Sequence, residues 1–484
     1  MNGVNKIIIN SVFISWILLT IVNAFDLREC FEIMVLYSLL SVYFVARLII
    51  IELKNFNGIN LKLPLLVGIC LRLIIPSIDI SFAALNGEKI TFLRDYNDVT
   101  DYILPTVIWM NIYYMIFYFA IEKYCNKIRI EGIIQPILQK ISVPKITIPL
   151  FVVGTLFNIA VSYVPAGLIP SFILLIFGKL SLLAIMAQMF DALFSNNRAR
   201  RNLFIAFILV SICIAMFFSF YKTPIMMNIV YYMFYYYLDC KYQNRKLITP
   251  KLVALCASTV LIMDIIVYPF MTTKRIVAGW DPNEGGVATI PYSNWEVLKS
   301  VLEGKSLSEK GDNTASDRLN AIPANAFFYK ECCLKGLRTS EVAINNIELL
   351  VPRFINPNKH NSEAGMMVYA YATTGSFKNI HLARSNNYIG QFGSAYLIGG
   401  WLLAIVLAFI NGRFIIFYYN FLIKYSRNVL AVMFLIPVFL DSIQAFEEIH
   451  DGGFLRMGMS TAYMLMIYLT SKLFKIKSIG AIKN

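Results

Sequence analysis

The sequence predicts an all-α, polytopic integral membrane protein of about twelve transmembrane helices with one large extracytoplasmic loop. Of its 484 residues, 58% are hydrophobic and only 15% are charged. A soluble core does not need that much apolar surface. Long apolar runs recur along the chain, and short basic segments separate them, which is typical of a multi-pass membrane protein.

The candidate spans are apolar runs of roughly 17–25 residues, the length that crosses a bilayer core. They cover residues 7–25, 33–52, 64–84, 103–121, 147–165, 168–190, 203–221, 223–239, 252–271, 394–411, 429–446 and 457–474. No small-residue cleavage site follows the first run, so we interpret it as a retained helix. The run Phe414–Ile423 is too short to span, and it either extends the preceding helix or lies in the interface.

Basic residues concentrate in alternate connections between the spans. They include Lys54, Lys62, Lys123, Lys127, Arg129, Arg198, Arg200, Arg201, Lys241, Arg245, Lys424 and Lys475. The positive-inside rule places these connections, and therefore both termini, in the cytoplasm. The net charge of +14 follows from this topology and does not indicate a nucleic-acid partner.

Hydropathy divides the chain into three parts. Residues 1–271 form a bundle of about nine helices, residues 272–393 form the large extracytoplasmic loop, and residues 394–484 form the C-terminal membrane helices. The loop contains helix-like pieces at Trp295–Glu303 and Ala326–Leu334. Its Gly and Pro residues indicate compact loop structure rather than a separate domain.

Ionisable residues near the middle of a span cost several kcal/mol unless they pair or face a cavity. Arg72, Lys179 and Asp264 occupy such positions. One interpretation is structural pairing, for instance of Lys179 with Asp264. The other is a polar cavity in which Arg72 and Lys179 attract a lipid-linked phosphate, and a proton-coupled transporter would also carry such charges.

The most informative stretch of the large loop is Leu349–Glu363, LLVPRFINPNKHNSE. Arg353 offers planar, bidentate donors to a phosphate, and Lys359 offers a point charge. Pro352 and Pro357 restrict the backbone around them. The stretch is therefore either an anion-binding site or a solvated basic turn.

Further loop residues complete a candidate site for phosphate chemistry. Arg318 and Arg384 are additional cations of the same loop. His360 is the first candidate for a general base, followed by Glu363 and then by Asp95 in the second outer loop. Alternatively, His360 is a solvated surface residue.

The acidic run Asp95, Asp98 and Asp101 could hold a divalent metal, but a solvated helix start with Asp caps is the favoured explanation. The eight cysteines have no metal-ligand spacing, and no phosphate-binding loop for ATP occurs. We therefore predict no metal and no cofactor.

The run VPRFINPNKH, residues 351–360, resembles the I-P-R-x-x-x-P-x-K signature of bacterial oligosaccharide repeat-unit polymerases, the O-antigen polymerase (Wzy-type) family. Arg318 upstream and the Asn/Gly-rich approach to the next helix, SNNYIGQFGSAYLIGGW, agree with it. The resemblance covers residues 310–412 by motif and the rest by topology. The chain departs from the family at Asn356 and Asn358, where Trp and Asp are common.

This resemblance implies a glycosyltransferase of the bacterial cytoplasmic (inner) membrane. The donor would be a growing glycan on undecaprenyl pyrophosphate, and the acceptor would be one repeat unit on the same lipid. Transfer en bloc on the outer face would build O-antigen or capsule. A chain-length regulator protein would be a candidate partner, together with the lipid bilayer.

Two other classes remain open. An O-antigen ligase, or a transferase that uses a polyprenyl-phosphate sugar, would depend on an outer-loop carboxylate such as Asp95. A flippase of lipid-linked oligosaccharide would show two pseudo-repeated halves with sites at the midplane, and no such halves are evident in the sequence.

Overall fold

The computed structural model of the full chain describes residues 3–54, 62–92, 97–122, 143–163, 171–195, 197–220, 223–243, 245, 258, 261–279, 290–303, 321–341, 364–378 and 390–425. The chain divides into two compact units. Unit 1 comprises Met1–Ile130, Leu319–Ala431 and Leu435–Ala481, and unit 2 comprises Glu131–Arg318, Val432–Phe434 and Ile482–Asn484.

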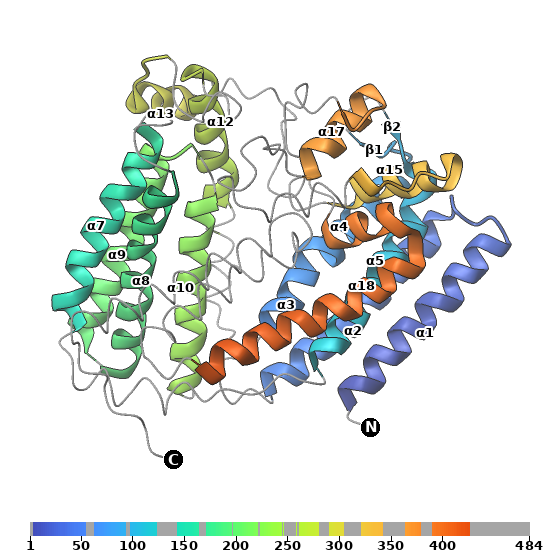
Figure 1. The fold of residues 1–484 in the computed structure, drawn as a ribbon, viewed down its shortest axis with the longest axis horizontal. Helices are drawn as coiled ribbons and strands as arrows, with labels where there is room; N and C mark the ends of the chain where they lie inside the picture. Colours follow the sequence, from blue (N-terminus) through green and yellow to red (C-terminus); the bar gives the residue numbers. More distant parts are fainter. Residues whose placement is uncertain are drawn as a thin grey trace. The chain divides into compact units, whose positions relative to one another are not determined.

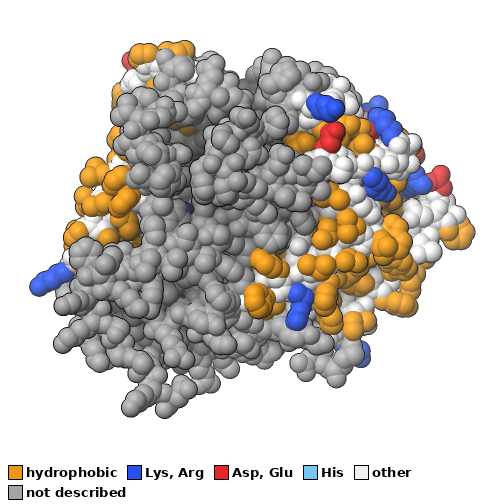
Figure 2. Space-filling model, viewed as in Figure 1, with side chains coloured by type: hydrophobic (Ala, Val, Ile, Leu, Met, Phe, Trp, Pro, Cys, Tyr) orange, Lys and Arg blue, Asp and Glu red, His pale blue; other side chains and the backbone are white. Residues whose placement is uncertain are grey.

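Seven helices of the described part are long and apolar enough to cross a membrane. The protein is therefore predominantly helical and multi-pass, as predicted. Large apolar side chains such as Phe13, Leu36 and Phe417 are exposed on the outer faces of these helices. Hydrophobic side chains accordingly cover much of the described surface in Figure 2, as expected for helix faces in contact with lipid.

The seven membrane-capable helices overlap the predicted spans 7–25, 33–52, 103–121, 147–165, 168–190, 203–221 and 394–411. The prediction of twelve spans is not confirmed as a count, because residues 429–446 and 457–474 lie outside the described residues. The same holds for the three-part division at residues 271 and 393, which stays a prediction.

Unit 1 is built around α5 (Ile103–Glu122), which is buried on nearly every side. Helix α1 (Gly3–Ala24) and helix α18 (Gly390–Tyr425) pack against it (Figure 1). A helix that is apolar all round belongs in the centre of a bundle. Gly412 of α18 allows a close approach, because a Cβ there would lie 2.7 Å from the carbonyl oxygen of Phe117.

A polar network inside unit 1 connects three helices. The amide nitrogen of Asn111 donates to the hydroxyls of Tyr37 at 2.7 Å and Ser15 at 3.2 Å. The hydroxyls of Ser15 and Tyr37 lie 2.8 Å apart. Tyr37 belongs to α2 (Phe31–Lys54), so the network fixes α1, α2 and α5 in one register. Paired polar groups are expected here, because an unpaired one in apolar surroundings is costly.

Within the described residues, each unit has one π-helical turn just before a proline. In unit 1, α3 (Lys62–Ile69) continues through η1 (Cys70–Ile74) into α4 (Ile75–Leu85). In unit 2, η3 (Met263–Val267) precedes α12 (Tyr268–Val277).

The π-turns follow from the chemistry of proline. Pro76 and Pro269 lack an N–H, so neither can bond the carbonyl four residues earlier. The main-chain N–H of the residue before each proline donates to the carbonyl oxygen five residues earlier. These bonds run from Ile75 to Cys70 and from Tyr268 to Met263. Arg72 and Asp264 lie within these two turns.

Helix α18 resolves the uncertainty over Phe414–Ile423, because the helix continues through this run to Tyr425. Its one break is at Gly400, with φ 71° and ψ −165°. Residues with a side chain essentially never adopt this conformation. The glycine therefore permits a sharp change of direction within the predicted tenth span.

Unit 2 contains four long helices: α7 (Val143–Tyr163), α8 (Ser171–Ser195), α9 (Arg198–Phe218) and α10 (Thr223–Tyr242). Helices α7 and α8 pack so closely that a Cβ on Gly154 would lie 2.1 Å from the main-chain nitrogen of Ser181. The side chain of Asn158 donates to Ser181 at 2.9 Å across the same contact. Small residues at a helix interface allow this approach.

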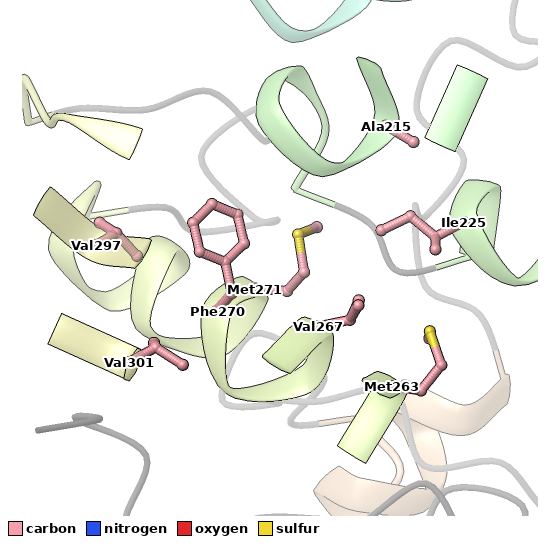
Figure 3. Close-up of a cluster of buried hydrophobic side chains, with 8 residues drawn as sticks. All are labelled: Ala215, Ile225, Met263, Val267, Phe270, Met271, Val297 and Val301. Atoms are coloured by element: carbon pink, nitrogen blue, oxygen red, sulfur yellow. The ribbon is translucent and has the colours of Figure 1, made fainter. Parts of the chain in front are cut away.

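An apolar cluster joins α9, α10, η3 and α12 to α13 (Asn294–Leu302), and Figure 3 shows its members. They are Ala215, Ile225, Met263, Val267, Phe270, Met271, Val297 and Val301. Helix α13 begins where Ser293 accepts a hydrogen bond from the main-chain nitrogen of Glu296. The predicted helical pieces Trp295–Glu303 and Ala326–Leu334 thus correspond to α13 and to α15 (Ile322–Lys335).

Candidate functional site

One end of unit 1 gathers the segments that the sequence assigns to the outer side. The hairpin of β1 (Thr91–Phe92) and β2 (Asn97–Asp98) lies beside α15, which belongs to the predicted large loop. Lys330 donates to the main-chain oxygen of Asp98 at 2.7 Å, and Phe327 lies 5.4 Å from Phe92 between ring centres. Segments about 230 residues apart in the sequence therefore share one surface, consistent with a common side of the membrane.

The first connection, between α1 and α2, reaches the same end. The Arg28 guanidinium lies 6.0 Å from the ring centre of Tyr102, and Lys330 lies at the same distance from that ring. Arg28 also forms an ion pair with Asp26 at 3.3 Å. Figure 2 shows Lys and Arg side chains at this end of the unit, near α15.

Asp98 forms hydrogen bonds that stabilise the turn just before α5. Its carboxylate accepts hydrogen bonds from the hydroxyl of Thr100 at 2.7 Å and from the main-chain nitrogen of Thr100 at 3.0 Å. These bonds lower the pKa of Asp98 below its ordinary value, and the bond from the Thr100 hydroxyl has the largest effect. Asp98 thus stabilises the turn that leads into α5, although the residue at the N-cap position of this turn is Val99. Among the described residues, no three acidic, His or Cys groups form a metal site.

A buried carboxylate connects α15 to α17 (Ala364–Thr374). Glu331 accepts from the Tyr371 hydroxyl at 2.8 Å and forms an ion pair with Lys335 at 2.6 Å. The sequence analysis missed Glu331, although its spacing of four residues from Lys335 on a helix is a recognisable pairing signal. Glu331 connects the two helices that precede and follow Leu349–Glu363 in sequence, the stretch that is predicted to bind phosphate.

Arg338 is a second residue that the sequence analysis missed. It follows α15 and is exposed, with its guanidinium 5.6 Å from the ring centre of Tyr396. The main-chain nitrogen of Thr339 donates to the carbonyl oxygen of Leu397 at 3.3 Å and so attaches this segment to α18. A Cβ on Gly400 would lie 3.0 Å from Nη2 of Arg338. The guanidinium therefore lies directly beside the break in α18.

Arg338 differs from two other cations at this end of unit 1 in its ion pairing. Arg28 pairs with Asp26, and Lys335 pairs with Glu331. No carboxylate among the described residues pairs with Arg338, whose Nη1 donates to the adjacent carbonyl of Leu337 at 2.6 Å. Its guanidinium also interacts with the Cys332 thiol. An exposed guanidinium without an acidic partner can bind an anion in a bidentate manner.

Most of the predicted site residues cannot be placed. Those outside the described residues are Asp95, Arg318, Arg353, Lys359, His360, Glu363 and Arg384. Arg72 is located in the backbone of η1 only, and Lys179 is half-buried in α8. Arg72 belongs to unit 1 and Lys179 to unit 2. Phosphate binding by each of them stays a prediction.

Known proteins give no independent guide to this end of the molecule. No family model, no curated protein and no solved structure matches the chain significantly.

Proposed function

We propose that the protein polymerises oligosaccharide repeat units carried on undecaprenyl pyrophosphate, by en bloc glycosyl transfer on the outer face of the bacterial inner membrane. The motif at residues 351–360 carries this proposal. Its location in the chain supports it, because the motif lies between α15 and α17, which pack together at the end of unit 1 described above. A membrane-embedded enzyme for two lipid-linked substrates needs its polar site at such an end of a helical bundle.

The proposed chemistry divides between cations and a base. Arg353, Lys359 and Arg318 stabilise the departing pyrophosphate, with Arg384, Arg72 and Lys179 as further phosphate-binding candidates. His360, or otherwise Glu363 or Asp95, accepts the proton of the acceptor hydroxyl. The glycosidic bond to the carrier breaks as the bond to the acceptor oxygen forms, and the carrier leaves as undecaprenyl pyrophosphate.

Substitution of Arg353 tests the proposal. Arg353→Ala removes donors that strengthen as the pyrophosphate departs, and one such donor is typically worth about 10²–10³ in rate. We expect the surface glycan of cells to collapse from a ladder to one unit per anchor at an unchanged protein level. Arg353→Lys keeps the charge but not the bidentate geometry, so it should restore the ladder only partly. A full ladder with Arg353→Ala would refute the assignment.

The main alternative is a ligase or a polyprenyl-phosphate-sugar transferase that depends on Asp95. Chelation by EDTA separates it from the polymerase, which should retain activity on purified lipid-linked units. Asp95→Asn should also leave a polymerase active if His360 or Glu363 is its base, whereas the alternative enzyme should lose activity. If the protein is a flippase, deletion of its gene should leave the repeat unit on the cytoplasmic leaflet. Accessibility of that unit to an externally added glycosidase distinguishes the two outcomes.

A further inference from the structure

Three indole rings meet on one flank of unit 1. Trp16 of α1, Trp109 of α5 and Trp401 of α18 lie 5.7–6.0 Å apart between ring centres. Trp109 is buried, whereas Trp16 is 42% exposed and Trp401 is 46% exposed. We call these residues the tryptophan cluster. Single tryptophans are common where helices meet the membrane interface, but three in mutual contact, two of them exposed, form a continuous aromatic surface.

The tryptophan cluster and Arg338 are close neighbours in the fold of unit 1. Trp401 follows Gly400, and the Arg338 guanidinium lies beside that glycine. The guanidinium also lies over Tyr396, whose ring centre is 5.4 Å from that of Tyr329. An exposed cation thus stands at the edge of an exposed apolar and aromatic surface, all within unit 1.

We infer that Arg338 and the tryptophan cluster form a binding site for a polyprenyl diphosphate, with the diphosphate at Arg338 and the first isoprene units against Trp401 and Trp16. Charge complementarity identifies the occupant. A guanidinium without a carboxylate partner among the described residues suits a diphosphate, and a flat indole surface suits a branched, unsaturated chain. The inference rests on the proposed function and adds residues for its carrier lipid that the motif does not include.

Gly400 explains how the fold keeps Arg338 at this place. A side chain at residue 400 would be strained, because φ is +71°, and its Cβ would press against the guanidinium. The hydrogen bond from Thr339 to Leu397 holds the segment next to the helix. Arg338 is therefore positioned by main-chain contacts, the Cys332 thiol and a ring, and its guanidinium is still exposed to a ligand.

The test measures binding of undecaprenyl diphosphate to the full-length protein in phosphatidylcholine nanodiscs, followed by tryptophan emission. Arg338→Gln should weaken the apparent affinity about tenfold to a hundredfold, the usual effect of losing hydrogen bonds to a charged group. Arg28→Gln is the matched control, because Arg28 also lies over a tyrosine ring but already pairs with Asp26. It should bind like the wild type.

A second ligand and a second variant separate the two halves of the site. Undecaprenol, which lacks the diphosphate, should bind the wild type and Arg338→Gln equally. Trp401→Leu should weaken both ligands and reduce the emission change. If Arg338→Gln does not fold, Arg338→Lys replaces it and should lose part of the affinity for the diphosphate only.

Several results would overturn the inference. These are absence of binding to the wild type, equal loss in Arg28→Gln and Arg338→Gln, or displacement of the carrier by an equal amount of phosphatidylglycerol, which would indicate a general site for anionic lipids. The assay needs no acceptor and no glycan. Carrier binding without polymerisation would refute only the proposed function, and polymerisation with unchanged carrier binding in Arg338→Gln would refute only this site.

Discussion

Two lysines, one in each unit, are almost completely buried, and the protein compensates their charges differently. Lys62 at the start of α3 is 5% exposed and lies 3.1 Å from the carboxylate of Glu52 and 2.5 Å from that of Glu122. Lys274 in α12 is 0% exposed and donates to three main-chain carbonyls at the end of α9, at 2.7–3.1 Å. The first lysine is neutralised by ionised groups, and the second by main-chain dipoles and by the faces of three aromatic rings, Phe220, Phe270 and Tyr292, at 4.9–6.0 Å.

The difference shows in the pKa of each lysine. Burial alone would lower the pKa of Lys62, but Glu122 and Glu52 together raise it above the ordinary value of 10.5. Burial lowers the pKa of Lys274 to about 8. Desolvation therefore dominates where carbonyl dipoles and aromatic rings surround the ammonium, and ion pairing dominates where carboxylates do.

Each lysine also has a distinct structural role. Glu52 ends α2, Lys62 begins α3 and Glu122 ends α5, so the ion cluster holds three helix ends of unit 1 together. Lys274 instead satisfies carbonyls at the C-terminal end of α9, where the helix lacks internal donors, and a cation there is favourable. Removing either lysine should destabilise its own unit, but by different mechanisms and amounts.

The largest effect is expected for Lys62→Met. The substitution leaves two carboxylates close together in a buried position without a cation, and breaking such a pair typically costs about 3–5 kcal/mol. Unfolding of the purified protein in detergent, measured by heat or by titration with a denaturing detergent, would show the loss. Lys54→Met at the exposed end of α2 is the control and should change stability by less than about 0.5 kcal/mol. Equal stability of the two variants would contradict the role of the cluster.

A smaller effect is expected for Lys274→Met. The substitution leaves main-chain carbonyls unsatisfied but no uncompensated charge, so we expect a cost of about 2–3 kcal/mol. Lys299→Met is the matched control, because the Lys299 side chain on α13 is exposed and its ion pair with Glu303 is long, at 3.8 Å. If Lys274→Met were as costly as Lys62→Met, dipoles and carboxylates would compensate a buried lysine equally well.

These two lysines also show what the sequence could and could not predict. Span positions follow from local apolar length, and the predicted span 103–121 agrees with α5 at Ile103–Glu122. Lys62 was interpreted only as a cytoplasmic loop cation. Its partners are 10 and 60 residues away, and their meeting depends on how three helix ends pack.

The candidate site shows the same limit. Arg353 was predicted from a local motif and stays a prediction, because it lies outside the described residues. Arg338 has no motif around it. It is a candidate because of its contacts with Tyr396 and Gly400, which are far along the chain. Contacts of this kind depend on tertiary packing, which a single sequence does not encode in local spacing.

The smallest and most specific effect is a difference in pH dependence. Between pH 8 and 10.5 the unfolded chain keeps a proton on Lys274 that the folded protein has lost, so the wild type gains stability with rising pH. The advantage of the wild type over Lys274→Met should therefore increase across this window. Lys62 has a raised pKa, so the advantage over Lys62→Met should stay constant up to about pH 10.5 and decrease only above it. Unfolding free energies measured at half-unit pH steps would show the two trends. A constant advantage over Lys274→Met would mean that the three carbonyls hold the ammonium form as firmly as two carboxylates do.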